Sequence, residues 1–244
     1  KVDKAGRLSL PPEILAQLGA APGASLHLVK EFGQVRLEPN LHALRRLYLE
    51  PTTACNLSCQ TCIRHTWSEA PGFISRELVK KVSSELKDFP FLQSIMLAGF
   101  GEPLVHRDIA WIVERLKTAS SASIELTTNG TLLDETMAGS LLEAGLDRLW
   151  VSFDGSSETS FNDIRRGASF NLVLRNVQRV RDLAVAQNKP FSLGISFVIM
   201  RENINELKNI EKLIEATGAD SLLLTNVLPY TEDMERQMVC RLAL

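Results

Sequence analysis

Short strand-like runs alternate with longer amphipathic helical runs from residue 45 onward. The strand-like runs are Leu47–Glu50, Ser94–Ala98, Ile124–Thr127, Leu149–Phe153, Leu193–Ile199 and Ser221–Val227. The helical runs between them are Glu77–Phe89, Asp108–Thr118, Asp134–Ala144, Leu172–Ala186 and Ile204–Thr217. Such alternation implies right-handed crossovers and a parallel sheet that is buried on both faces. The predicted class is therefore α/β, and the six strands form either an open doubly wound sheet or a partial (βα)6 barrel.

The composition is that of an ordinary folded protein. Of the 244 residues, 45% are hydrophobic and 23% are charged. No apolar run reaches the roughly eighteen residues that a membrane span needs. Lysine and arginine number 27 against 29 aspartates and glutamates, so no overall field draws the chain to nucleic acid or anionic lipid. We therefore exclude a disordered chain and an integral membrane protein, and we do not expect nucleic-acid binding.

Three of the four cysteines fall within eight residues, namely Cys55, Cys59 and Cys62, and Cys240 lies far along the chain. Because so few cysteines do not make a disulfide scaffold, this clustering indicates a metal in a reducing compartment. The chain begins at Lys1 without an initiator methionine and ends at Leu244 within a helical pattern. We therefore expect a piece of a longer cytoplasmic protein.

The cysteine cluster directly follows the first predicted strand, where parallel α/β folds gather their chemistry. Three thiolates at this spacing can hold three irons of a cubane cluster and leave the fourth iron open. A structural zinc instead takes a closed set of four ligands, and Cys240 or His65 would have to complete that set. The cysteines alone leave both kinds of site open.

Polar, glycine-containing segments follow the next three strands: Ala98–Pro103, Thr127–Thr131 and Val151–Gly155. Taken singly, each is typical of a turn or a helix cap. Their side chains can donate and accept hydrogen bonds with hydroxyl and carboxylate groups. Since three such segments occur at successive strand ends after a triple-cysteine loop, we interpret the set as one functional site.

The Cys-x3-Cys-x2-Cys motif and these segments resemble the radical S-adenosylmethionine (SAM) superfamily over residues 45–244. The resemblance implies that Cys55, Cys59 and Cys62 bind a 4Fe-4S cluster whose open iron binds SAM, with no catalytic residue beyond these metal ligands. Thr61 stands where many members have an aromatic residue against adenine. The cofactor contacts that the resemblance implies are Gly101 and Glu102 at the methionine amino group, Thr128 and Asn129 along the cavity, Ser152 and Asp154 at the methionine or ribose, Arg166 at the carboxylate and Leu228 at the adenine.

Membership of that family would make the chain an oxidoreductase-type enzyme that cleaves SAM reductively. The resulting 5'-deoxyadenosyl radical abstracts hydrogen from a substrate, and a low-potential electron donor such as ferredoxin or flavodoxin is implied. The amino-acid sequences of the segments Thr127–Gly130 and Ser152–Gly155 most resemble those of family members with a C-terminal SPASM extension. Such members modify a peptide or protein or mature a cofactor. Cys240 is either the first trace of that extension, the rest of which is missing, or an unligated thiol.

Residues 1–40 differ from the rest of the chain in their pattern of predicted elements. Strand-like stretches at Arg7–Leu10, Ser25–Val29 and Gln34–Leu37 surround one short helix, Glu13–Leu18, which ends at a C-capping Gly19. This stretch resembles the AbrB-like swapped-hairpin domains, in which two copies interlace and many members bind DNA. Residues 1–40 carry five basic and four acidic groups, and this small net positive charge does not favour DNA binding, which depends on neutralising phosphates. We therefore predict a small domain for homodimerisation or partner docking.

An N-terminal AbrB-like domain followed by a radical SAM core resembles the maturases of tungsten-dependent aldehyde oxidoreductases. The predicted substrate is accordingly a peptide, a protein or a cofactor precursor. The alternative is an AbrB-like DNA-binding regulator in which the cysteines hold a structural zinc or iron–sulfur site. The weak basic charge and the position of the cysteines on a βα loop favour the enzyme.

Overall fold

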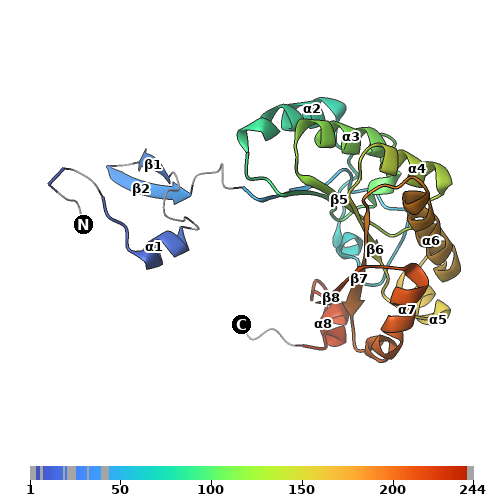
Figure 1. Cartoon of the computed structure of the whole chain (residues 1–244). Helices are drawn as coiled ribbons and strands as arrows, with labels where there is room; N and C mark the ends of the chain where they lie inside the picture. Colours follow the sequence, from blue (N-terminus) through green and yellow to red (C-terminus); the bar gives the residue numbers. More distant parts are fainter. Residues whose placement is uncertain are drawn as a thin grey trace.

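The main body is a six-stranded parallel sheet with helices on its outside (Figure 1). The structure is a computed structural model, and it describes residues 4–5, 8–18, 20, 26–31, 33–39 and 44–240. The strands of the sheet are β3 (Arg46–Leu49), β4 (Ser94–Leu97), β5 (Ser123–Thr128), β6 (Arg148–Ser152), β7 (Ser192–Ile199) and β8 (Ser221–Asn226). Its helices are α2 (Arg76–Glu85), α3 (Ile109–Ala119), α4 (Glu135–Glu143), α5 (Glu158–Ile164), α6 (Phe170–Ala186), α7 (Ile210–Thr217) and α8 (Glu232–Gln237).

The order of the strands in the sheet decides between the two predicted architectures. The order is β3-β4-β5-β6-β7-β8, the same as along the sequence. Since every right-handed crossover then advances in one direction, all crossover helices lie on one face, whereas a doubly wound sheet reverses direction part-way. The sheet therefore curls into a half-barrel, which confirms the predicted α/β class and the partial (βα)6 barrel.

The two faces of the sheet differ in chemistry because strand side chains alternate between them. On the helix side, residues such as Ile124, Leu126 and Leu149 are fully buried and belong to one core with helix residues of α3 and α4. Burial of each such side chain contributes roughly 1.5–3 kcal/mol. On the opposite face, Trp150 Nε1 donates to Glu125 Oε2 over 3.0 Å. This second face supplies polar side chains to the inside of the half-barrel.

The predicted elements agree with the structure except where an element is short. Every strand starts within one residue of its predicted start, and Gly145 and Gly218 end α4 and α7 with positive φ angles of 90° and 66°. The predicted Ile204–Thr217 helix begins as a 3₁₀ helix, η5 (Ile204–Asn209). The helices α5 and α8 are seven and six residues long and were not predicted, since two turns are too short to show a clear 3.6-residue period.

The N-terminal region forms a separate antiparallel hairpin, drawn in blue in Figure 1. Its elements are α1 (Pro12–Gln17), β1 (Leu26–Glu31) and β2 (Gln34–Pro39). Gly33 turns the chain with a φ of +79°, so the predicted hairpin turn is confirmed. Of the predicted strand-like stretch Arg7–Leu10, Leu8 makes a β-bridge, Ser9 and Leu10 belong to no strand, and Arg7 lies outside the described residues, as does the predicted cap Gly19.

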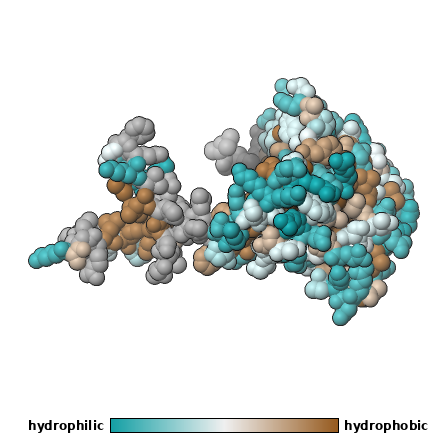
Figure 2. All heavy atoms as spheres, turned by 90° about the horizontal axis from the view of Figure 1, so that it is seen from above, coloured by the Kyte–Doolittle hydropathy of each residue, from teal (hydrophilic) through white to brown (hydrophobic). Residues whose placement is uncertain are grey.

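Hydrophobic side chains of this N-terminal region stay in contact with solvent. Leu28 is 69% exposed and Val35 is 64% exposed. Figure 2 shows hydrophobic atoms gathered over this part of the chain. A two-stranded hairpin is marginally stable by itself, so this surface is not a self-sufficient core. Among the described residues, no helix combines the length and apolarity of a membrane span.

Candidate active site

A cavity of about 230 Å³ opens at the carboxyl ends of the central strands, and we call it the cysteine cavity. The cysteine loop and the ends of β4, β5 and β6 all contribute to its wall. The lining residues are Cys55, Leu57, Cys59, Thr61, Cys62, Gly99, Phe100, Gly101, Glu102, Thr127, Thr128, Asn129, Ser152, Asp154, Arg165 and Val198. The structure therefore brings together nine predicted site residues, namely Cys55, Cys59, Cys62, Gly101, Glu102, Thr128, Asn129, Ser152 and Asp154.

Backbone hydrogen bonds hold the cysteine loop from both sides. On the side of β3, the backbone N–H of Ala54 donates to Thr52 Oγ1 over 3.0 Å. On the other side, Ser58 N donates to the carbonyl of Arg166 over 3.1 Å, and Gln60 N donates to the carbonyl of Ile164 over 2.9 Å. The loop therefore has a fixed path between the first strand and the end of α5.

Glu102 is buried and joins the ends of β4 and β5. Its Oε1 accepts hydrogen bonds from Thr128 Oγ1 at 2.7 Å and Leu104 N at 3.0 Å, and its Oε2 accepts one from Asn129 N at 2.7 Å. Burial raises the pKa of Glu102, and these hydrogen bonds oppose the rise. Because both carboxylate oxygens already have donors, this side chain holds the wall of the cavity together.

Asn129 connects the end of β5 to the cysteine loop. Its Nδ2 donates to Asn56 Oδ1 over 2.9 Å and lies 4.0 Å from Cys55 Sγ. Its Oδ1 accepts a hydrogen bond from the backbone N–H of Thr131 over 2.9 Å. The side chain is thus fixed at both ends and positions the first cysteine.

Glycine is required at position 101 by close approach of the backbone. A Cβ there would lie 2.0 Å from the carbonyl oxygen of Thr52 and 2.7 Å from that of Ala54. The sequence analysis did not identify Glu50, whose Oε1 accepts hydrogen bonds from the backbone N–H groups of Phe100 and Gly101. A carboxylate that ends a predicted strand is the signal that points to this role.

Arg165 is a second residue of the cavity wall that the sequence did not predict. It lines the cysteine cavity, and its Nη1 donates to Asp154 Oδ2 over 2.8 Å, with side-chain exposures of 10% and 2%. Burial lowers the pKa of Arg165, but the negative charges of Asp154 and Cys59 outweigh it and the net pKa is raised. The Nε of Arg165 is buried and has no hydrogen-bond partner among the described residues.

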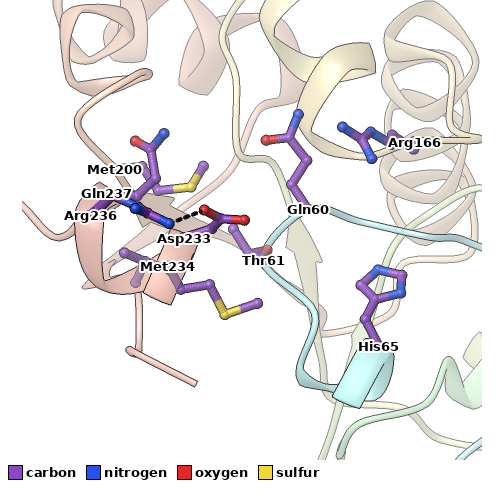
Figure 3. A pocket seen from close by; sticks show the side chains of 10 residues that line it. Gln60, Thr61, His65, Arg166, Met200, Asp233, Met234, Arg236 and Gln237 are labelled. Carbon is purple, nitrogen blue, oxygen red and sulfur yellow. Dashed lines mark hydrogen bonds and ion pairs between the residues drawn. The ribbon is translucent and has the colours of Figure 1, made fainter. Parts of the chain in front are cut away.

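The predicted cofactor residue Arg166 lies outside the cysteine cavity. It is exposed and lines a second cavity of about 500 Å³, which we call the outer cavity (Figure 3). Adjacent arginines at the end of α5 point to different sides, and no sequence signal distinguishes them. Arg165 therefore takes the place in the cysteine cavity that the sequence analysis gave to Arg166.

Leu228 is also outside the cysteine cavity, half exposed at the end of β8. Its neighbour Val227 is buried and lines the outer cavity with Met200 and Met234. Thr61 lines both cavities, so they adjoin at this residue.

Burial dominates the chemistry of the thiols. It raises the pKa of Cys59 to about 11, against the opposing charge of Arg165, and it also raises the pKa of Cys55. Thiolates are the metal-binding form, so a bound cation must displace these protons. The exposed Cys240 does not line the cysteine cavity, and His65 Nε2 makes a 2.8 Å hydrogen bond with the carbonyl of Cys59.

The donor set fits an iron–sulfur cluster. Within residues 44–240 and the other described segments, no three His, Cys, Asp or Glu side chains converge around one metal ion. In a cubane cluster each cysteine binds its own iron, so the sulfurs stand around the cluster and do not meet at a point. Three soft thiolates on the wall of one cavity match that requirement.

A family model described as the Radical SAM superfamily matches residues 49–214, which include the cysteine loop and most of the cavity wall. The chain belongs to the radical SAM superfamily. This family uses a 4Fe-4S cluster and SAM, and the protein is therefore a radical SAM enzyme.

Two curated relatives of this radical SAM enzyme come from Pyrococcus furiosus and Sulfurisphaera tokodaii. The chain is 30% identical over 200 residues to the tungsten-containing aldehyde ferredoxin oxidoreductase cofactor-modifying protein of Pyrococcus furiosus, covering 80% of this chain and 55% of that protein. It is 33% identical over 181 residues to a probable GTP 3',8-cyclase of Sulfurisphaera tokodaii, covering 73% and 54%. The chain thus spans about half the length of the curated relatives it matches.

Solved structures share the fold. The anSMEcpe protein with bound AdoMet matches with a TM-score of 0.62 at 23% identity, covering 76% of this chain and 52% of that chain. Streptococcus suis SuiB bound to its precursor peptide SuiA matches with a TM-score of 0.64 at 14% identity, covering 82% and 43%. These likenesses support the partial barrel of the radical SAM enzyme.

Proposed function

We propose that this chain is the core of a maturase that binds a 4Fe-4S cluster on Cys55, Cys59 and Cys62 and acts on a cofactor precursor. The observation that supports it most is the convergence of the three cysteines and three strand ends on one cavity. When bound, the cluster supplies an electron that splits SAM into methionine and a 5'-deoxyadenosyl radical, which abstracts hydrogen from the substrate. A ferredoxin or flavodoxin is the electron donor.

Arg165 and Ser152 bind the amino-acid end of SAM in this proposal. A buried guanidinium with an unpartnered Nε suits a carboxylate, since charge-assisted hydrogen bonds are the stronger kind. Gly101 lets the segment after β4 pack closely against the backbone of Thr52 and Ala54, and Glu102 with Asn129 keeps that wall in place. These residues orient the cofactor and keep water out of the cavity.

The outer cavity receives the nucleoside end of SAM. Met200, Val227 and Met234 give it an apolar wall, and Gln60 and Gln237 add amide groups at its edge (Figure 3). Methionine sulfur makes favourable contacts with aromatic rings, which suits a purine in a pocket without an aromatic side chain at Thr61.

A cofactor precursor is favoured over a peptide by the relatives. The Pyrococcus furiosus protein is described as cofactor-modifying, and the Sulfurisphaera tokodaii protein as a GTP cyclase. The SuiB structure contains a bound peptide, but at 14% identity this similarity supports only a shared fold. A tungsten-dependent oxidoreductase is the proposed recipient of the matured cofactor. A C-terminal SPASM extension in the full protein belongs to the same proposal.

The N-terminal hairpin is proposed to be an AbrB-like dimerisation element of a cytoplasmic enzyme. The exposed Leu28 and Val35 need a covering surface, and a second copy offers a matching one. Removal of residues 1–40 is expected to halve the mass measured by sedimentation velocity. An unchanged mass would exclude this part of the proposal.

Anaerobic reconstitution tests the central proposal. The chain should turn brown with iron and sulfide, and addition of SAM and dithionite should release 5'-deoxyadenosine. Cys59→Ala should abolish that release, whereas Cys240→Ala should leave it unchanged because Cys240 is exposed outside the cavity. A colourless protein that takes up one zinc ion tightly would overturn the proposal in favour of a regulator with a structural site.

A further inference from the structure

Arg165 and Cys59 lie opposite each other on two hydrogen-bonded segments. Ser58 N donates to the carbonyl of Arg166, and Gln60 N donates to the carbonyl of Ile164, so the residues between these bonds face each other. Both Cys59 and Arg165 line the cysteine cavity. The backbone therefore fixes a cationic side chain next to the second cysteine of the motif.

The charge of Arg165 has little solvent around it. Its side chain is 10% exposed, and its one ion-pair partner in the described chain, Asp154, is 2% exposed. Asp154 is itself fixed, because its Oδ1 accepts a hydrogen bond from Val198 N over 3.0 Å. The ion pair thus places one positive and one negative charge at set positions in the cavity wall, where screening by water is weak.

We propose that this buried ion pair sets the reduction potential of the cluster, with Arg165 raising the potential and Asp154 lowering it. The inference rests on the proposed binding of the cluster by the three cysteines. On reduction, one electron passes from a reduced ferredoxin, flavodoxin or dithionite to the cluster and adds one negative charge. A fixed cation beside Cys59 stabilises that charge, and a fixed anion opposes it.

The surroundings of Cys59 indicate that the cation has the larger effect. Arg165 faces Cys59 across the two backbone hydrogen bonds, whereas Asp154 reaches this region through its 2.8 Å ion pair with Arg165 Nη1. The adjacent Arg166 is exposed and lines the outer cavity, so water screens its charge. Arg166 is therefore the matched control for the same change of charge.

The experiment is an EPR-monitored redox titration of the cluster-loaded chain without SAM. Arg165→Gln should make the midpoint potential more negative, and Asp154→Asn should make it less negative. A tenfold change in the reduction equilibrium, the expected scale for Arg165→Gln, is about 59 mV for one electron. Arg166→Gln should leave the midpoint within a small fraction of that shift.

The opposite signs separate this role from a merely structural one. Arg165→Gln leaves Asp154 buried without its partner and can impair folding, so Asp154→Asn and the double variant are decisive. The double variant should return the midpoint to a value between those of the single variants. Shifts of the same sign for both single variants, or an equal shift for Arg166→Gln, would overturn the inference.

Failure of this inference and failure of the proposed function give different results. If the unaltered chain takes up no cluster, the proposed function fails. If the unaltered chain loads the cluster and releases 5'-deoxyadenosine while all variants share one midpoint, only the inference about Arg165 and Asp154 fails.

Discussion

The half-barrel and the N-terminal hairpin use strands of similar length in opposite ways. In β5 and β6, apolar side chains such as Leu126 and Leu149 are fully buried under helices. In β1 and β2, Leu28 and Val35 are about two thirds exposed. The half-barrel therefore carries its own hydrophobic core, whereas the hairpin leaves apolar surface exposed. Local strand propensity is similar in both, and burial makes the difference.

Truncation of one leucine in each region gives the largest contrast. Leu126→Ala should lower the free energy of unfolding by about 2–5 kcal/mol, because the side chain is fully buried and a cavity remains. Leu28→Ala should change it by at most about 0.5 kcal/mol in dilute solution, because Leu28 is mainly exposed. Urea unfolding followed by circular dichroism measures both. If Leu28→Ala lowered the free energy of unfolding by a comparable amount, and more so at higher protein concentration, Leu28 would be covered by another molecule in solution.

The contrast between buried and exposed side chains extends to the thiols. Burial raises the pKa of Cys59 to about 11 from an ordinary value of 9.0. Because a raised pKa leaves less thiolate at a given pH, the reactive fraction at pH 8 should be about a hundredfold below that of an ordinary thiol. In the metal-free chain, iodoacetamide should label exposed Cys240 first and Cys59 much more slowly, as read by peptide mass spectrometry. Equal rates in the folded chain would contradict the buried position, and equal rates in urea are the control.

Substitution of one glycine in each region should change the free energy of unfolding by a smaller amount. Gly101→Ala should cost about 1–3 kcal/mol, because the new Cβ would meet the carbonyl oxygens of Thr52 and Ala54 and the backbone must shift. Gly33→Ala should cost about 1 kcal/mol, since φ is +79° but no atom lies within 4 Å of the new Cβ. Thermal melts of both variants measure the difference. A larger loss at Gly33 would indicate that the hairpin is more tightly packed than the half-barrel wall.

Deletion of residues 1–40 should have the smallest effect on the half-barrel. Among the described residues, the core of the half-barrel draws on residues from Leu44 onward, so its free energy of unfolding should change by less than about 0.5 kcal/mol. Differential scanning calorimetry compares the main transition of the two chains at low concentration. A clear fall of that transition would mean that the two regions stabilise each other.

The sequence predicts the long elements well and the short ones poorly. The period of apolar residues marks the six strands and the five long helical runs, because the helix-covered face of the sheet buries every second strand residue and one side of each helix. The short helices α5 and α8 were not predicted, although α5 ends at the residue that precedes Arg165. Nine of the eleven predicted site residues lie together because motif positions at strand ends share one edge of a parallel sheet.

The two site residues that the structure places elsewhere, Arg166 and Leu228, share one cause. Arg165, the neighbour of Arg166, lines the cysteine cavity, and Val227, the neighbour of Leu228, lines the outer cavity. Side-chain direction changes by a large angle from one residue to the next, and both positions lie in irregular connections just after an element has ended, where its period no longer applies. Glu50 was missed for a related reason, since its hydrogen bonds join residues fifty positions apart.

By itself, the sequence determined the class of the fold, the position of the cysteine cluster and the family, because periodicity and motif spacing are local properties of the chain. Tertiary structure alone decided that the sheet is a half-barrel, that Arg165 faces Cys59 and that Glu102 joins two strand ends. These depend on strand order and on contacts between distant segments, where close packing selects one direction for each side chain.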